Sequence, residues 1–98
     1  MDEQQAFLID LLTKRKYPIA TPCCRVGRDK LNQIVISGDE SISRFHFTIS
    51  KQNDSYTIED TKSQYGTFLN SKRLEGPEPL KDGDVVKIGV SLFWFQLQ

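Results

Sequence analysis

The sequence predicts an all-β sandwich of two twisted, mainly antiparallel sheets, built from about ten or eleven short strands. Apolar and polar residues alternate over several short stretches, and turn-forming residues separate these stretches at close intervals. No stretch has a convincing helical pattern. The chain has 98 residues, which can build one hydrophobic core but not two. We therefore expect a single domain spanning residues 1–98.

The first expected strand covers residues 6–12, where Phe7, Ile9 and Leu11 alternate with their neighbours. The same residues also fit one face of a helix, with acidic residues before them and basic residues after them, as the helix dipole favours. We favour the strand, because β-like segments follow and a lone short helix is only marginally stable. Residues 13–16 then form a charged turn.

Three short strands are expected next. Residues 17–20 contain a proline, which suits an edge strand because proline cannot donate to a sheet ladder. Residues 23–26 form the following strand, and Gly27 marks a sharp exit that leaves Arg28 on a loop. Residues 33–36 form a short apolar strand.

The clearest strand covers residues 45–50, in which Phe45 and every second residue after it are expected to share the buried face. The alternation places His46 on the other face. A turn at residues 52–55 and a strand at residues 56–59 complete a β-hairpin.

Two strands and a loop are expected after this hairpin. Residues 67–69 form a strand of minimal length, and residues 74–80 form a loop because they hold two prolines and a glycine. The Asp82-Gly83 pair is typical of a tight turn, and residues 85–88 form the strand that follows it.

The last expected strand covers residues 92–97, with Phe93, Phe95 and Leu97 on one face and Trp94 on the other. The sequence ends on this strand, so we expect the domain to have been excised from a longer protein.

The composition excludes several classes of function. Thirteen basic and thirteen acidic residues cancel, so no net field favours nucleic acid or an anionic membrane. No apolar run is long enough to span a membrane, and the N-terminus does not have the pattern of a signal peptide. Any anion that the protein binds must therefore be met by a local site.

The two cysteines, Cys23 and Cys24, are adjacent, so in a strand their side chains point to opposite faces. This arrangement excludes a disulfide framework and favours an intracellular setting. With one histidine and no Cys-x-x-Cys motif, no structural zinc site is expected, and no cofactor is predicted.

Catalysis and nucleotide binding are not predicted. Ser43, His46 and Asp60 could be imagined as a hydrolase triad, but the histidine lies on a strand and there is no Gly-x-Ser-x-Gly elbow. A packed, hydrogen-bonded histidine that braces a loop fits better. The glycines are isolated rather than in a phosphate-binding loop, and the basic run at residues 14–16 reads as a solvated turn.

Two polar loops, residues 41–46 and 63–70, flank the hairpin, and Arg28 follows another strand. A guanidinium offers forked donors that match phosphate oxygens, and a serine hydroxyl adds a further donor. Three or four charge-assisted bonds of this kind can bind one dianionic phosphate. Arg28, Ser43 and Arg44, together with the loop from Lys62 to Tyr65, are therefore the candidate site.

This ordered set of residues resembles the forkhead-associated (FHA) domain, a phosphothreonine-binding β-sandwich. The family pattern is a Gly-Arg pair, a Ser-x-x-His motif and an Asn-Gly-Thr-type turn that leads to a final asparagine. The corresponding residues are Gly27-Arg28, Ser43-Arg44-Phe45-His46 and Tyr65-Gly66-Thr67-Phe68-Leu69-Asn70. The resemblance covers nearly the whole chain and places the binding loops at one end of the sandwich.

The resemblance also implies a role for each matching residue. Arg28 and Ser43 match the phosphate-contacting arginine and serine, and Arg44 matches a position that touches the phosphate or the peptide. Gln64 falls where a further phosphate or backbone contact is made, and Lys62 and Tyr65 belong with it to the peptide-binding loop. The residues that match structural positions are Gly27, His46, Gly66, Thr67 and Asn70.

Tyr65 departs from the family pattern. The usual asparagine hydrogen-bonds the backbone of the bound peptide, and a tyrosine hydroxyl on a long stem cannot reproduce its paired donor and acceptor. Either the affinity for the peptide falls or the ring packs on the peptide instead. Phosphate recognition by Arg28 and Ser43 does not depend on this residue.

The resemblance implies a non-catalytic module that binds phosphothreonine-containing proteins and needs neither nucleic acid nor membrane. FHA modules of this compact kind occur in nuclear DNA-damage signalling proteins, and the Tyr-Gly-Thr-Phe loop is similar to that of the mutator and checkpoint-mediator type. A nuclear location is therefore expected. A second copy of the chain is another candidate partner, because Thr13 lies in a segment that could be phosphorylated.

The alternative is a phosphate-independent interaction or homodimerisation domain that keeps the same fold while Tyr65 weakens the site. An apolar sheet face left exposed would favour this alternative, because large exposed patches mark protein contacts.

Overall fold

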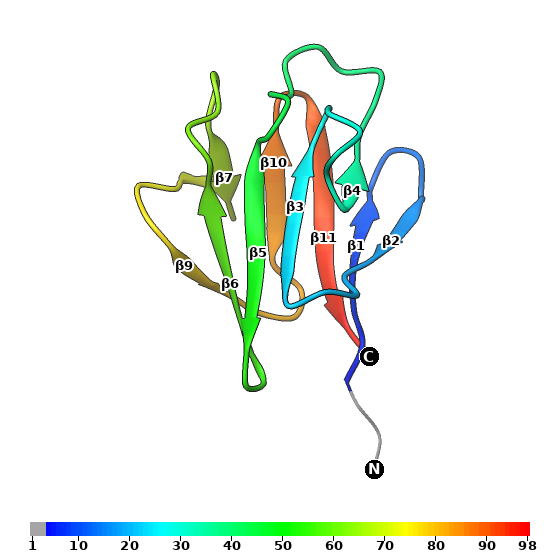
Figure 1. The fold of residues 1–98 in the computed structure, drawn as a ribbon, viewed down its shortest axis with the longest axis vertical. Helices are drawn as coiled ribbons and strands as arrows, with labels where there is room; N and C mark the ends of the chain where they lie inside the picture. The colour runs from blue at the N-terminus through cyan, green and yellow to red at the C-terminus, as the bar shows by residue number, and fades with distance from the viewer. Residues whose placement is uncertain (1–3) are drawn as a thin grey trace.

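The computed structural model describes residues 4–98 as two β-sheets packed face to face (Figure 1). One sheet has six strands in the order β2-β1-β11-β10-β7-β8, and the other has five in the order β4-β3-β5-β6-β9. The strands of the six-stranded sheet are β1 (Ala6–Asp10), β2 (Lys16–Pro18), β7 (Thr67–Leu69), β8 (Lys72–Arg73), β10 (Val85–Ile88) and β11 (Ser91–Leu97). Those of the five-stranded sheet are β3 (Cys23–Gly27), β4 (Ile34–Val35), β5 (Phe47–Gln52), β6 (Ser55–Asp60) and β9 (Glu78–Leu80).

The core lies between the two sheets and is filled by alternate residues of the long strands. Phe93 and Phe95 of β11 are fully buried, as are Phe47 and Ile49 of β5. The ring of Tyr56 meets Phe95 edge to face with 5.3 Å between the ring centres, which joins the two sheets. The predicted β-sandwich is therefore confirmed.

Most strands lie where the alternation predicts them. All pairings are antiparallel except that between β3 and β4, and the predicted hairpin is formed by β5 and β6. The first strand ends at Asp10, two residues earlier than expected. Its carboxylate accepts hydrogen bonds from the backbone N–H groups of Leu12 and Thr13, at 2.8 and 3.0 Å, and so turns the chain.

The predicted loop at residues 74–80 is partly wrong, because Glu78–Leu80 forms strand β9. The strand tolerates its proline since β9 is the edge of the five-stranded sheet, where Pro79 pairs with Thr57 on one side only. Strand β8 was not predicted either; its two residues pair with Phe68 and Leu69.

The predicted inward and outward faces around His46 are also wrong. The strand begins at Phe47, so Phe45 and His46 belong to the preceding loop. Phe45 is 38% exposed and lies under the guanidinium of Arg25, whereas His46 is fully buried. The alternation fails here because the chain leaves the strand geometry before it reaches these two residues.

The cysteines point to opposite faces, as the sequence predicts. Cys23 is exposed and Cys24 is buried. Burial, together with the neighbouring Cys23 thiol, raises the pKa of the Cys24 thiol to about 11, so Cys24 stays protonated and unreactive at neutral pH.

Four connections meet at one end of the sandwich, shown at the top of Figure 1. They are the links from β3 to β4, from β4 to β5, from β6 to β7 and from β10 to β11. The β5–β6 turn and the C-terminus lie at the opposite end. Among residues 4–98 there is no helix long and apolar enough to cross a membrane. The convergence of the four loops positions the candidate site.

Candidate functional site

The loop that begins at Arg28 lies directly against the loop that contains Ser43. The backbone N–H groups of Arg28 and Asp29 donate to the carbonyl oxygens of Ser43 and Arg44, both at 3.1 Å. Gly27 permits this approach, because a Cβ atom there would lie 2.2 Å from the carbonyl oxygen of Arg44. Any larger residue would therefore separate the two loops.

The Arg28 side chain is exposed but held at its inner end. Its Nε donates to the carbonyl oxygen of Ile42 at 2.7 Å. Within residues 4–98, no hydrogen bond is formed by its two terminal amino groups, so they can both donate to an anion. The tether fixes the direction of the guanidinium before any ligand binds.

The Ser43 hydroxyl connects this loop to the β6–β7 loop. Its oxygen accepts a hydrogen bond from the backbone N–H of Gln64 at 3.0 Å. Because the oxygen acts as an acceptor in this contact, the hydroxyl hydrogen can point outward and donate to an anion. Arg28 and Ser43 therefore present donors from one rigid pair of loops.

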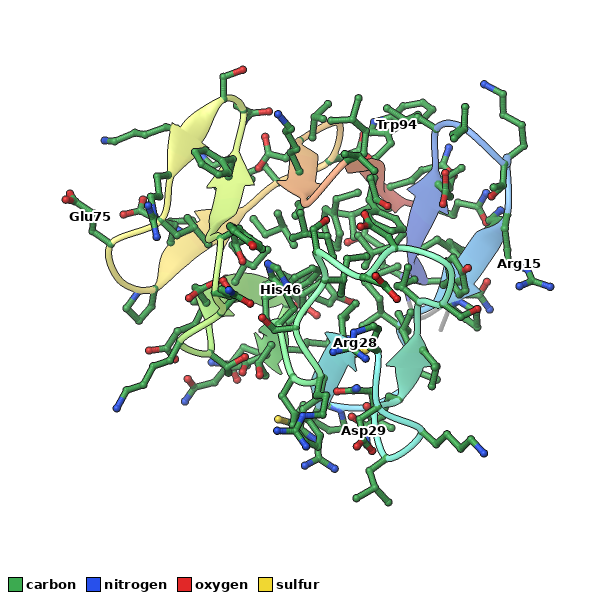
Figure 2. The ribbon with its side chains drawn as sticks, turned by 90° about the horizontal axis from the view of Figure 1, so that it is seen from above. Arg15, Arg28, Asp29, His46, Glu75 and Trp94 are labelled. Atoms are coloured by element: carbon green, nitrogen blue, oxygen red, sulfur yellow. The ribbon has the colours of Figure 1, made fainter. Side chains whose placement is uncertain are left out.

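His46 holds the same two loops together from beneath. Its Nδ1 accepts a hydrogen bond from the backbone N–H of Ser43 at 3.0 Å, and its Nε2 donates to the carbonyl oxygen of Gly66 at 2.9 Å. These contacts require the neutral imidazole with the proton on Nε2. Figure 2 shows His46 near the middle of the molecule, viewed from the loop end.

The geometry excludes the imagined hydrolase triad. The backbone N–H of Ser43, rather than its hydroxyl, contacts His46, and the second ring nitrogen faces Gly66. Asp60 forms hydrogen bonds with Ser63 and Thr67 but with neither Ser43 nor His46. No described residue set could hold a metal ion.

Asn32 is a structural residue that the sequence did not reveal. Its buried amide nitrogen donates to the carbonyl oxygens of Asp29 and Arg44, at 2.8 and 2.7 Å. It therefore holds the Arg28 loop to the backbone of the Ser43 loop. A single asparagine before a short strand gives no signal of this role, since the partners are 3 and 12 residues away.

Asp60 organises the β6–β7 loop. Its carboxylate accepts hydrogen bonds from the Ser63 hydroxyl and the Thr67 hydroxyl, both at 2.6 Å, and from the Ser63 backbone N–H at 3.0 Å. Burial raises the pKa of Asp60, but these hydrogen bonds outweigh burial and lower the pKa below its ordinary value of 3.8. The Asp-x-x-Ser spacing was the available signal for this turn.

The β4–β5 loop is anchored to the β10–β11 turn by Asp39. Its carboxylate accepts hydrogen bonds from Ser41 and, at 3.1 and 3.2 Å, from the Val90 backbone N–H and the Ser91 hydroxyl. Gly89 has a φ of 57°, and a Cβ atom there would overlap the Ser41 hydroxyl. The loop that carries Ser43 is thus fixed at both of its ends.

The remaining predicted ligand-binding residues lie on the surface around Arg28 and Ser43. Arg44, Lys62, Gln64 and Tyr65 are all exposed, and the Tyr65 side chain is 55% exposed. Gln64 and Tyr65 border a shallow groove whose other wall is formed by the Asp39-anchored loop and the β10–β11 turn. A chain bound at Ser43 can lie along this groove.

Of the predicted structural residues, Gly66 and Thr67 shape the β6–β7 loop, whereas Asn70 lies away from that loop. Thr67 is fully buried against Asp60, and Gly66 has a φ of 92° with the Arg73 side chain packed against its Cα. Asn70 lies one strand length away, roughly 10 Å along β7. Its side chain joins the β7–β8 turn to Asp84 and to the Val85 backbone N–H, at 3.0 and 2.9 Å. Asn70 therefore stabilises the sheet rather than the ligand-facing loops.

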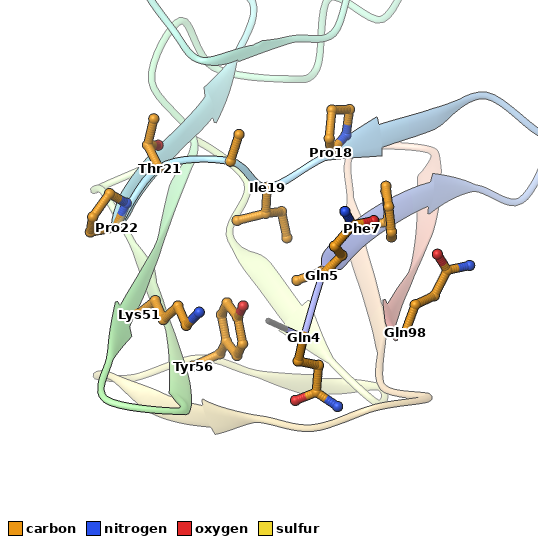
Figure 3. Close-up of a pocket in the computed structure, with 12 residues that line it drawn as sticks. Gln4, Gln5, Phe7, Pro18, Ile19, Thr21, Pro22, Lys51, Tyr56 and Gln98 are labelled. Atoms are coloured by element: carbon orange, nitrogen blue, oxygen red, sulfur yellow. The ribbon is translucent and has the colours of Figure 1, made fainter. Parts of the chain in front are cut away.

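A larger hollow opens at the opposite end of the sandwich, where Tyr56 and Lys51 face Ile19 across the gap between the sheets (Figure 3). Among the described residues that line it, Lys51 carries the one formal charge, and its ammonium lies 5.7 Å from the Tyr56 ring centre. None of the described side chains that line this hollow is a carboxylate, an imidazole or a guanidinium. The loop end is therefore the better candidate site.

Comparison with known proteins agrees with this geometry. The FHA domain family matches residues 24–89. The chain is 33% identical to the transcriptional regulatory protein EmbR of Mycobacterium tuberculosis over 92 residues, which cover 94% of the chain and 24% of EmbR. It is 36% identical to nibrin of Danio rerio over 75 residues, 74% of the chain and 9% of nibrin. The chain thus spans about a quarter or less of these relatives.

Two solved structures with bound peptides are similar to this fold. The structure of Mycobacterium tuberculosis EmbR in complex with a low affinity phosphopeptide superposes with a TM-score of 0.89 over 94% of the chain and 24% of EmbR, at 33% identity. The yeast Dun1 FHA domain in complex with a doubly phosphorylated (pT) peptide has a TM-score of 0.81 and 25% identity, covering 95% of the chain and 74% of that domain.

Replacing His46 should destabilise both loops together. His46→Ala leaves the Ser43 N–H and the Gly66 carbonyl buried without partners, so we expect the free energy of unfolding in urea to fall by roughly 2–5 kcal/mol. Ser50→Ala, on the exposed face of the same hairpin, is the control and should change it by no more than about 0.5 kcal/mol. Equal, small effects of both substitutions would contradict the bracing role.

The lowered pKa of Asp60 predicts a specific dependence on pH. Since the folded pKa lies below the unfolded value, the stability from ionised Asp60 is present above about pH 3.8 and lost as the pH falls through the folded pKa. Asp60→Asn should therefore be less stable than the wild type at pH 7, and the difference should shrink below pH 3.8.

Urea unfolding measured between pH 7 and pH 2.5 checks this expectation. The control is Glu59→Gln, which changes an exposed neighbouring carboxylate on β6. A difference between Asp60→Asn and wild type that stays constant across the range would show that ionisation of Asp60 does not stabilise the loop.

Proposed function

This chain belongs to the FHA domain family, whose members are interaction modules, and we propose that it binds phosphothreonine-containing proteins. The phosphate is received by Arg28, Ser43 and Arg44. The observation that carries the proposal is that two donors are held on loops that lie against each other: the Arg28 guanidinium is tethered to the Ile42 carbonyl, and the Ser43 hydroxyl to the Gln64 backbone N–H.

The chemistry of this pair suits a phosphate dianion. The two terminal amino groups of Arg28 can form a forked contact with two phosphate oxygens, and the Ser43 hydroxyl can donate to one of them. Arg44 and Lys62 bring further positive charge to the rim of the site. Because the donors are already oriented, binding loses little side-chain entropy.

The peptide then runs along the groove beside Gln64 and Tyr65. The backbone N–H of Gln64 is occupied by Ser43, so its side-chain amide contacts the peptide. Tyr65 supplies an aromatic surface where the family pattern has an amide. Of the two outcomes that the sequence left open, we favour packing of the ring on the peptide, because more than half of its surface is exposed beside the groove. The preference for threonine over serine follows from family membership alone.

Support for this function comes from the relatives crystallised or studied with peptides. EmbR has been solved with a phosphopeptide, and the Dun1 FHA domain with a phosphorylated (pT) peptide. The nuclear, DNA-damage setting of the mutator or checkpoint-mediator type stays a prediction. A tagged copy of the protein would test it by its location before and after DNA damage.

A second copy phosphorylated at Thr13 also stays a prediction. Thr13 lies in the β1–β2 turn, where its hydroxyl oxygen accepts a hydrogen bond from the Arg15 backbone N–H at 3.2 Å. The turn is exposed, so a kinase could reach it. Binding of a phosphorylated peptide with the sequence of residues 8–18 would test this partner directly.

Replacing Arg28 should remove most of the phosphate dependence. Arg28→Ala deletes a forked donor from a charged contact, which costs about 1.5–3 kcal/mol, or roughly ten- to a hundredfold in affinity. Titration calorimetry with a phosphothreonine peptide library and its unphosphorylated counterpart measures this change. Arg15→Ala, in the β1–β2 turn, is the matched control and should bind like the wild type. If wild type and Arg28→Ala both fail to distinguish the two libraries, the proposal is wrong.

Replacing Tyr65 should affect the peptide rather than the phosphate. Loss of an aromatic contact in Tyr65→Ala costs about 0.5–1.5 kcal/mol, so affinity should fall roughly two- to tenfold. The ratio of affinities for phosphorylated and unphosphorylated peptides should stay unchanged. Tyr65→Phe should retain wild-type binding, since the ring makes the contact. A loss in Tyr65→Phe as large as in Tyr65→Ala would assign the contact to the hydroxyl instead.

A further inference from the structure

The outer faces of the two sheets differ in character. Strand residues on the outer face of the five-stranded sheet are mostly polar, as a solvent-facing sheet requires; they include Arg25, Thr48, Ser50, Thr57 and Glu59. The outer face of the six-stranded sheet is instead apolar. Its apolar members, called the apolar face below, are Phe7, Ile9, Phe68, Val85, Leu92 and Trp94.

Strand pairing brings several members of the apolar face side by side. Trp94 pairs with Ile9 of β1 on one side and with Val85 of β10 on the other, so three apolar side chains form one row across the sheet. In the next row Leu92 is followed by Lys87 and then Phe68. Leu92 is 41% exposed and Trp94 is 37% exposed. An exposed apolar surface of this kind marks a protein contact.

The apolar face is separate from the phosphate site. The core already uses the opposite side of β11, where Phe93 and Phe95 are buried. Figure 2 shows Trp94 on one side of the molecule and Arg28 and Asp29 on the other, with His46 between them. The face therefore serves neither the core nor the phosphopeptide, and an inference from it does not depend on the proposed function.

The charged residues on the outer face of the six-stranded sheet indicate which kind of partner would bind there. Lys16 pairs with Ile9 and lies over the Phe7 ring, its ammonium 4.1 Å from the ring centre, and Lys87 pairs with Leu92. No strand residue on the outer face of this sheet is an aspartate or glutamate. A second copy docked face to face would offer these lysines no carboxylate from its outer strand residues, since a twofold interface joins the same patch on both subunits. An apolar partner with acidic margins complements the face.

We propose that the apolar face docks an amphipathic helix of a partner protein, with its apolar stripe on Trp94 and Leu92 and acidic side chains near Lys16 and Lys87. An amphipathic helix can pack its apolar stripe on one face of a sheet and keep charged side chains along both margins of that stripe. Lys16 lies on one side of the β11 residues Leu92 and Trp94 and Lys87 on the other, which suits an apolar stripe flanked by carboxylates.

Trp94 is the one tryptophan of the chain, so its fluorescence reports occupancy directly. The probes are two synthetic amphipathic helical peptides with the same leucine stripe, one flanked by glutamates and the other by lysines. We expect the glutamate-flanked peptide to shift the Trp94 emission to the blue in a saturable way and to bind at least tenfold more tightly than the lysine-flanked peptide.

Charge reversal provides the decisive comparison. The double variant Lys16→Glu/Lys87→Glu should reverse the preference between the two peptides, while Lys30→Glu, on the β3–β4 loop, should keep it. Arg28→Ala should bind the glutamate-flanked peptide like the wild type, which separates this face from the phosphate site.

Four results would overturn the proposal. The two peptides could bind equally, or neither could shift the emission. Vesicles of phosphatidylserine and phosphatidylcholine could shift the emission when the glutamate-flanked peptide does not, which would assign the face to a lipid surface. Sedimentation could reveal a dimer that dissociates in Leu92→Glu, which would assign the face to a second copy of the chain.

Discussion

The imidazole of His46 is the point on which the loop end of this sandwich depends. Ser43 and Gly66 are 23 residues apart in sequence, yet a single buried ring forms hydrogen bonds to both. The ring accepts from one loop and donates to the other, so only one neutral tautomer satisfies both contacts. A buried polar group without its partner costs stability, and the two loops are therefore locked to each other as well as to the ring.

The surrounding polar residues extend this constraint. Asn32 holds the Arg28 loop to the carbonyl of Arg44, and Asp60 gathers Ser63 and Thr67 into one turn. The Asp60 carboxylate and the Asn32 amide nitrogen are satisfied by these contacts, whereas within residues 4–98 the Asn32 Oδ1 is buried without a hydrogen-bond partner. None of these contacts uses the outward donors of the site. A chain with no net charge can thus carry the proposed phosphate site, because the local orientation of donors rather than net charge would supply the attraction.

The two surfaces of the molecule follow from different parts of the same fold. The phosphate site is made by loops at one end, where irregular backbone lets donors converge. The apolar face is made by regular strands, where cross-strand pairing aligns side chains from β1, β10 and β11. A partner that carried both a phosphothreonine and an acidic amphipathic helix could occupy the two together, because they lie on different sides of the sandwich.

The sequence by itself determined the class of fold and most of its strands. The alternation in residues 92–97 was enough to place Phe93 and Phe95 on one face of the last strand and Trp94 on the other. The order of the Gly-Arg, Ser-x-x-His and Gly-Thr motifs was enough to predict the FHA family. These features depend on periodicity and local spacing, which a sequence displays directly. Alternation misled only where the chain departs from strand geometry, at Phe45 and His46, and where an edge strand tolerates a proline, at Pro79.

Only the tertiary structure decided which residues meet. The Asn32 amide and the His46 ring act on partners brought close by sheet pairing and loop packing, and no spacing in the chain reveals those partners. The apolar face is another feature that only the tertiary structure reveals. Each of its side chains looks like an ordinary strand residue in sequence, and they become one surface because the register places Ile9, Trp94 and Val85 side by side.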